Sequence, residues 1–107
     1  MNNQRLNQLL TFYAEDPTDP FNLYALALEY RATETVKAAA FFKTLLRDFP
    51  GYLPAYYPAA QFFAEQNDEA MARGVFENGL ALAEAKGQEK TRRELLAAYC
   101  QWQDEWN

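Results

Sequence analysis

The stretch from Asp48 to Leu80, DFPGYLPAYYPAAQFFAEQNDEAMARGVFENGL, decides the fold because the segment before it repeats the same pattern. Residues 24–30 read YALALEY and match residues 57–63, YPAAQFF, at a constant offset of 33 positions. Pro17 and Pro50 keep the same offset upstream, where a proline ends the preceding helix. Self-similarity at a fixed period of roughly 33–34 residues is typical of stacked helical repeats.

Small and aromatic residues recur in register along both copies. A small residue lets two helices of a hairpin approach closely, and an aromatic residue fills the space beside the crossing. Beyond the internal turn the offset becomes 34, so the first copy has one residue fewer in that turn. The small residues are Ala27, Ala38, Ala60 and Ala72, and the aromatic residues are Tyr30, Phe42, Phe63 and Phe76.

This combination of small, aromatic and proline positions resembles the tetratricopeptide repeat, over about Leu6 to Gly87. Ankyrin repeats have a similar length but carry a β-turn signature that is absent here. The resemblance implies an all-α fold, in which antiparallel helical hairpins stack as a short right-handed solenoid of about six helices. Both copies lack the usual glycine of the inner turn and have Thr33-Glu34-Thr35 and Asn67-Asp68 instead.

We expect a single domain over residues 1–107, built from two repeats and two capping helices. Capping helices cover the faces that a short array would otherwise expose. The expected parts are an N-terminal cap at 1–17, repeats at 18–50 and 51–87, and a C-terminal cap at 88–107. The expected helices are 3–14, 20–32, 34–48, 54–66, 68–86 and 88–105.

Several residues predict how these helices begin. Asp19 is suited to the N-cap of the second helix, with proline following at the first helical position. Thr33 or Thr35 is expected to cap the third helix, and Asn67 the fifth. Pro58 lies beyond the first turn of the expected fourth helix, so we predict a bend or a loosened turn near residues 56–58.

The terminal helices each carry one apolar stripe. Residues three or four positions apart share a helix face, so each stripe should pack on the neighbouring repeat. We expect Cys100, one turn after Leu96, to be buried or partly buried. The expected stripes are Leu6, Leu9, Leu10 and Tyr13 in the first helix, and Leu95, Leu96, Tyr99, Trp102 and Trp106 in the last.

Composition excludes several classes of function. Half of the 107 residues are apolar and 16% are aromatic, which favours a folded domain. No apolar run approaches the length of about 18–20 residues that spans a membrane, and the start MNNQRLNQLL does not resemble a secretory signal. The single cysteine allows no internal disulfide, so we expect a cytoplasmic protein. The resemblance implies a small bacterial member of the tetratricopeptide family. The net charge of −5 argues against general nucleic-acid binding.

No residue pattern predicts catalysis, a cofactor or a metal site. The chain contains no histidine, which removes the common triads and the HExxH zinc site. An enzyme would have to use Glu65, Asp68 and Glu69 with a metal, but these residues lack the spacing of a calcium loop. Lys90, Arg92 and Arg93 are expected to form the polar face of the last helix.

The resemblance implies that the first helix of each repeat lines a concave groove that contacts a peptide or a partner helix. The places where some members clamp a C-terminal carboxylate hold Tyr24, Leu28 and Pro58 here, so we reject that mode. On this sequence the groove face would present an apolar, aromatic patch with a polar edge, as a protein contact does. Its residues are Phe21, Tyr24, Leu28, Arg31, Tyr57 and Gln61.

We therefore expect a non-catalytic interaction module or scaffold that binds a protein segment in this groove. Two alternatives stay open from the sequence. The same aromatic surface could form a structural homodimer without an external ligand. Alternatively, the terminal helices could cover Phe21, Tyr24 and Tyr57, which would make these residues ordinary core.

Overall fold

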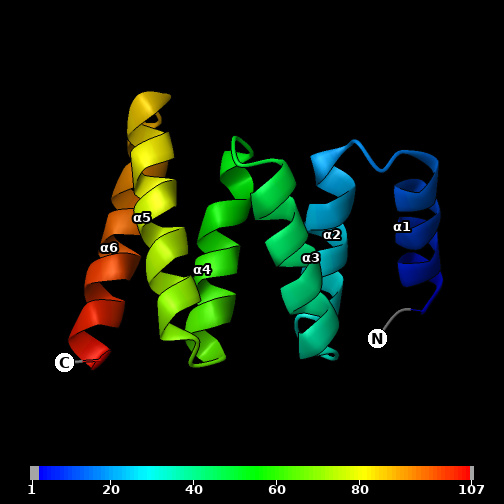
Figure 1. The fold of residues 1–107 in the computed structure, drawn as a ribbon, viewed down its shortest axis with the longest axis horizontal. Coiled ribbons are helices and arrows are strands. Elements are labelled where there is room, and N and C mark those ends of the chain that lie inside the picture. Colours follow the sequence, from blue (N-terminus) through cyan, green and yellow to red (C-terminus); the bar gives the residue numbers. More distant parts are fainter. Residues whose placement is uncertain (1–2, 107) are drawn as a thin grey trace. The chain divides into compact units, whose positions relative to one another are not determined.

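The computed structural model describes residues 3–106, in which six α-helices and one 3-10 turn follow one another without a strand (Figure 1). The predicted all-α fold is thus confirmed. The backbone forms two compact units, Met1–Ala55 and Tyr56–Asn107. The elements are α1 (Asn3–Glu15), α2 (Pro20–Tyr30), α3 (Thr35–Asp48), η1 (Leu53–Ala55), α4 (Tyr56–Glu65), α5 (Glu69–Ala85) and α6 (Glu89–Trp106).

In the first unit, α2 packs against both α1 and α3. Leu23 and Leu45 belong to its buried core, together with Ala55 from η1. Buried Asn22 fastens the end of α1, because its side-chain amide donates to the carbonyl oxygens of Phe12 (3.2 Å) and Asp16 (3.0 Å). These bonds satisfy a buried polar group and hold the first helix on the second.

In the second unit, α5 packs against both α4 and α6. The helices approach closely at Gly79, where an added Cβ would stand 2.9 Å from the Cβ of Tyr56 and 3.2 Å from Cδ1 of Leu95. A glycine at this place allows α4 and α6 to contact the same turn of α5.

The repeated small and aromatic residues lie in the two cores, as predicted. Small side chains bring the helices of each hairpin together, and the aromatic rings fill the adjoining space. All eight are buried, with exposed fractions between 0 and 4%: Ala27, Tyr30, Ala38, Phe42, Ala60, Phe63, Ala72 and Phe76.

Three of the predicted helix starts need correction. Asp19 does cap α2 by accepting a hydrogen bond from the backbone N–H of Phe21 at 2.9 Å. Neither Thr33 nor Thr35 caps α3, since the N-cap is Glu34, whose side chain makes no capping bond, and Thr35 is already helical. The inner turn of the first copy has one residue fewer than that of the second, and Thr33 and Thr35 lie on either side of the N-cap.

Asn67 is not the cap of α5, because it ends α4 instead. Its φ of 59° is left-handed, a conformation that asparagine tolerates better than most residues. The N–H of Asn67 donates to the carbonyl of Ala64 (3.1 Å), and that of Asp68 to the carbonyl of Phe63 (3.0 Å). This pair of bonds is a Schellman motif, so Asn67 replaces the missing inner-turn glycine. Asp68 then caps α5 through Met71 N–H at 3.2 Å.

The predicted start of the fourth helix at residue 54 is also wrong. A 3-10 turn, Leu53–Ala55, precedes α4, which begins at Tyr56. Pro58 is therefore the third residue of the α-helix, where the backbone N–H has no partner within the helix. Residues 56–58 form the first turn of α4, so the bend or loosened turn predicted there is not present; the 3-10 turn lies before them.

Both apolar stripes of the terminal helices are narrower than predicted. Leu10 is 37% exposed and Leu96 is 39% exposed, whereas Leu9, Leu95 and Trp102 are buried. Residues 95, 99 and 102 face α5. Residues 96 and 100 lie on a neighbouring face of the helix, which is exposed to solvent. Cys100 is exposed, so its predicted burial is wrong. The side chain of Trp106 lies outside the described residues.

Candidate functional site

Four of the predicted site residues lie in the first unit, three on α2 and the fourth, Arg31, at its C-cap. Phe21 is 54% exposed, Tyr24 and Leu28 are half-buried, and Arg31 is exposed. The Tyr24 ring lies edge-on to the rings of Phe21 (6.5 Å between centroids) and Tyr52 (5.8 Å). Phe21 and Tyr24 therefore offer aromatic surface that is anchored on one side by the core of the unit.

The second unit contains an open cleft of about 500 Å³ between α4 and α6. The two helices do not form its floor alone, since Phe76 of α5 lies between them. The lining comes from one face of each helix, at spacings of three and four residues. From α4 come Tyr57, Gln61, Ala64 and Glu65, and from α6 come Glu94, Ala97, Ala98, Gln101, Trp102 and Glu105.

Small side chains keep this cleft open. Ala64, Ala97 and Ala98 line it where larger residues would fill the space between the two helices. At one end it overlaps a second hollow of about 450 Å³, which shares Ala64 and Trp102 and adds Asn67. The concave surface therefore follows α4 to its C-terminal turn.

Every charged residue that lines the cleft is acidic. Glu65, Glu94 and Glu105 are exposed, and within residues 3–106 no basic side chain forms an ion pair with them. The polar side chains between them are the amides of Gln61 and Gln101. The cleft is thus an apolar and aromatic floor with amide and carboxylate groups above it.

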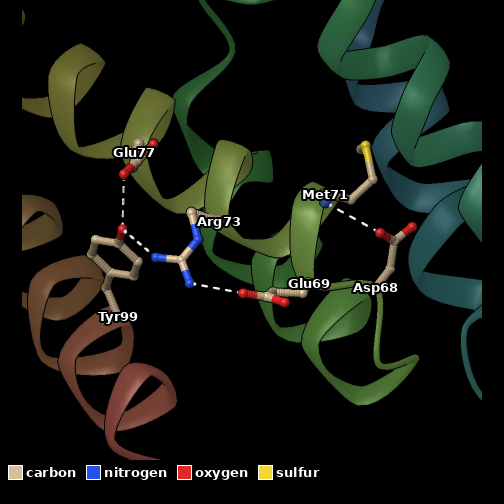
Figure 2. A network of polar contacts seen from close by, with 6 residues as sticks. All are labelled: Asp68, Glu69, Met71, Arg73, Glu77 and Tyr99. Carbon is tan, nitrogen blue, oxygen red and sulfur yellow. Dashed lines mark hydrogen bonds and ion pairs between the residues drawn. The ribbon is translucent and has the colours of Figure 1, made fainter. Parts of the chain in front are cut away.

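A polar network fastens α6 to α5 beside this cleft (Figure 2). Tyr99 donates to a carboxylate oxygen of Glu77 at 2.9 Å and accepts a long 3.5 Å bond from Arg73. Arg73 also pairs with Glu69 at 3.0 Å and lies over the Trp102 ring at 5.1 Å. The bond to Glu69 raises the pKa of the Arg73 guanidinium, and burial raises the pKa of the Tyr99 phenol.

The three acidic residues that an enzyme would have to use have separate structural roles. Glu65 lines the cleft, Asp68 caps α5, and Glu69 pairs with Arg73. No group of three potential metal ligands gathers within the described residues 3–106. Over the same residues, no helix combines the length and apolarity needed to cross a membrane.

The sequence matches no family model and no curated protein. Its structure does resemble the solution structure of a tetratricopeptide repeat domain protein from Salinibacter ruber. The two are 30% identical in sequence and superpose with a TM-score of 0.74, over 81% of this chain and 89% of the other. The chain belongs to the tetratricopeptide repeat family. The resemblance expected from the sequence is therefore confirmed.

The two predicted repeats correspond to the helix pairs α2–α3 and α4–α5, and the helices of each pair pack against each other. The structure places Tyr57 and Gln61 together in the α4–α6 cleft, and the other four predicted residues on α2 in the other unit. Phe21 is not covered as core, because more than half of its side chain is exposed.

Sequence reasoning missed the contribution of α6 to the cleft. None of Glu94, Gln101 and Glu105 was predicted to be a site residue, although all three line the cleft. The spacing of residues 94, 97, 98, 101 and 105 was the available signal, because positions separated by three or four residues share one helix face. This face is small and polar, so it carries no hydrophobic signature.

Proposed function

We propose that this tetratricopeptide repeat protein is a non-catalytic interaction module that binds an extended peptide or a partner helix of another protein. The observation that carries the proposal is the open α4–α6 cleft, which contains the predicted residues Tyr57 and Gln61. Aromatic floor, polar edge and small lining residues are the features of a surface that buries a partner segment. Phe21 and Tyr24 add aromatic surface on α2.

The test compares proteins captured from source-cell lysate by the native chain and by a Phe21→Glu, Tyr57→Glu double variant. Phe21 is a better choice on α2 than Tyr24, because Tyr24 packs against the buried cluster around Leu23 and its replacement would disturb folding. A protein retained by the native chain and lost from the double variant supports the proposal.

The matched control is Phe12→Glu, which makes the same chemical change at a phenylalanine that is 52% exposed on α1. Circular dichroism should show equal helicity for all three proteins. If the double variant retains every partner that the native chain retains, the proposed site is wrong.

A second candidate function is self-association through the same aromatic surface. The exposed Phe21 ring beside Tyr24 favours it, because a large exposed aromatic side chain is commonly covered by a partner. Light scattering across a range of protein concentrations tests it. Mass that doubles with concentration in the native chain, and not in Phe21→Glu, supports a homodimer, whereas a constant monomer mass excludes one.

The absence of catalysis and the cytoplasmic, bacterial setting belong to the same proposal. The absence of catalysis is supported by the lack of a histidine, and the bacterial setting by the source of the similar structure. The single cysteine supports the cytoplasmic setting. Fold alone does not assign a partner, so the identity of the bound protein must come from the capture experiment.

A further inference from the structure

We propose that the α4–α6 cleft selects a partner segment that carries lysine or arginine, with Glu65, Glu94 and Glu105 as the residues that recognise its positive charge. This inference rests on the proposed function and names the chemistry of the partner. The occupant is one basic peptide segment in extended or helical form.

The shape of the cleft supports a side chain with an apolar stem and a charged end. Ala64 and the edge of Trp102 are shared by the main cleft and the hollow at its end, and Glu65 and Glu105 stand beside them in both. Lysine and arginine lay their methylene groups on apolar surface and keep the charge at the rim. Their length therefore suits a small apolar floor with carboxylates above it.

The charge of the surroundings supports the same choice. The second unit contains five basic and nine acidic residues, so it carries four of the five net negative charges of the chain. Arg73, the basic residue that contacts the cleft-lining Trp102, is already paired with Glu69. Acidic partner segments would meet like charge at three positions, which disfavours them over basic ones.

The experiment selects random twelve-residue peptides displayed on phage against the native chain, and then measures synthetic copies by fluorescence anisotropy. Selected peptides should be enriched in lysine and arginine. Replacing Glu65, Glu94 and Glu105 together with glutamine should weaken their binding about threefold or more, since one exposed ion pair contributes about 1.4- to fivefold. Raising the salt concentration should weaken binding to the native chain more than binding to this variant.

Two further substitutions locate the peptide. Asp104→Asn removes one charge from α6 next to Glu105 but outside the cleft lining, so it should leave affinity within about twofold. Ala97→Phe fills the cleft from an exposed position and should abolish binding, while Ala81→Phe makes the same change at an exposed site of α5 outside the lining. Helicity should stay native in all variants.

The outcomes separate this inference from the function on which it rests. Basic peptides that are lost in both the triple glutamine variant and Ala97→Phe support both. Neutral or acidic peptides that are lost only in Ala97→Phe overturn the preference for positive charge and keep the cleft as a binding site. Peptides that bind Ala97→Phe as tightly as the native chain, or a selection that enriches none, overturn both.

Discussion

The contact at Gly79 makes a sharp prediction about stability. In Gly79→Ala the new methyl group would stand 2.9 Å from the Cβ of Tyr56, an atom fixed to the backbone of α4. Leu95 also lies within 3.2 Å, so α5 would have to shift from a neighbour on either side. Overpacking of this kind costs about 1–3 kcal/mol, against a gain of about 1 kcal/mol from better helix propensity. The variant should lose up to about 2 kcal/mol.

Gly74→Ala is the matched control because it makes the same change in the same helix. An added Cβ at Gly74 meets no atom within 4 Å, so only the propensity gain of about 1 kcal/mol applies. Urea unfolding followed by circular dichroism measures both variants. If Gly79→Ala is stabilised as much as Gly74→Ala, the close approach of α4, α5 and α6 is refuted.

Three other predictions concern helix ends. Asn67→Gly should stabilise the protein by about 0.5–1 kcal/mol in thermal unfolding, since glycine adopts a positive φ without strain. A loss of stability would contradict the left-handed conformation of residue 67. Asp68→Ala should cost about 1 kcal/mol in the same assay by removing the α5 cap, and an unchanged Tm would exclude that role. Hydrogen bonding from Arg92 lowers the pKa of Glu89, so this carboxylate favours folding above its ordinary pKa and loses that contribution as pH falls. In Arg92→Gln an NMR titration should show the Glu89 pKa rising towards its ordinary value; an unmoved pKa would argue against the pair.

The sequence predicted the helices and the core because both depend on periodic residues. Ala27 and Phe42 repeat at Ala60 and Phe76, and all four are buried, as the pattern required. A repeat supplies the same information twice, so one ambiguous segment is corrected by its copy. The type and order of the elements could therefore be predicted, with boundaries displaced by one or two residues at most ends.

Local competition between neighbouring residues accounts for most of the errors. Asn67 and Asp68 are both good capping residues, and pattern alone cannot tell that the first takes the left-handed turn while the second caps. Cys100 was expected to be buried because it lies one turn after Leu96, but Leu96 is itself 39% exposed and the thiol is exposed with it.

The candidate site could be predicted only in part. Tyr57 and Gln61 followed from the place of α4 in its repeat, but the facing side of α6 consists of alanine, glutamine and glutamate. Such residues are common on any solvated helix, so their meaning depends on what lies opposite. Only the packing of α4 and α6 on α5 shows that these positions border a shared space.

Asp68 takes part in two helix ends. Its N–H donates to the carbonyl of Phe63 at the end of α4, and its carboxylate accepts from the N–H of Met71 at the start of α5. Inserting or deleting a residue in this turn would separate the two tasks and misalign both helices. The turn between α2 and α3 has no residue known to share both tasks, because Thr33 and Glu34 both donate to the carbonyl of Tyr30 and the N-cap residue Glu34 makes no side-chain capping bond. Length variation among related proteins should therefore be tolerated in the first hairpin and rare in the second.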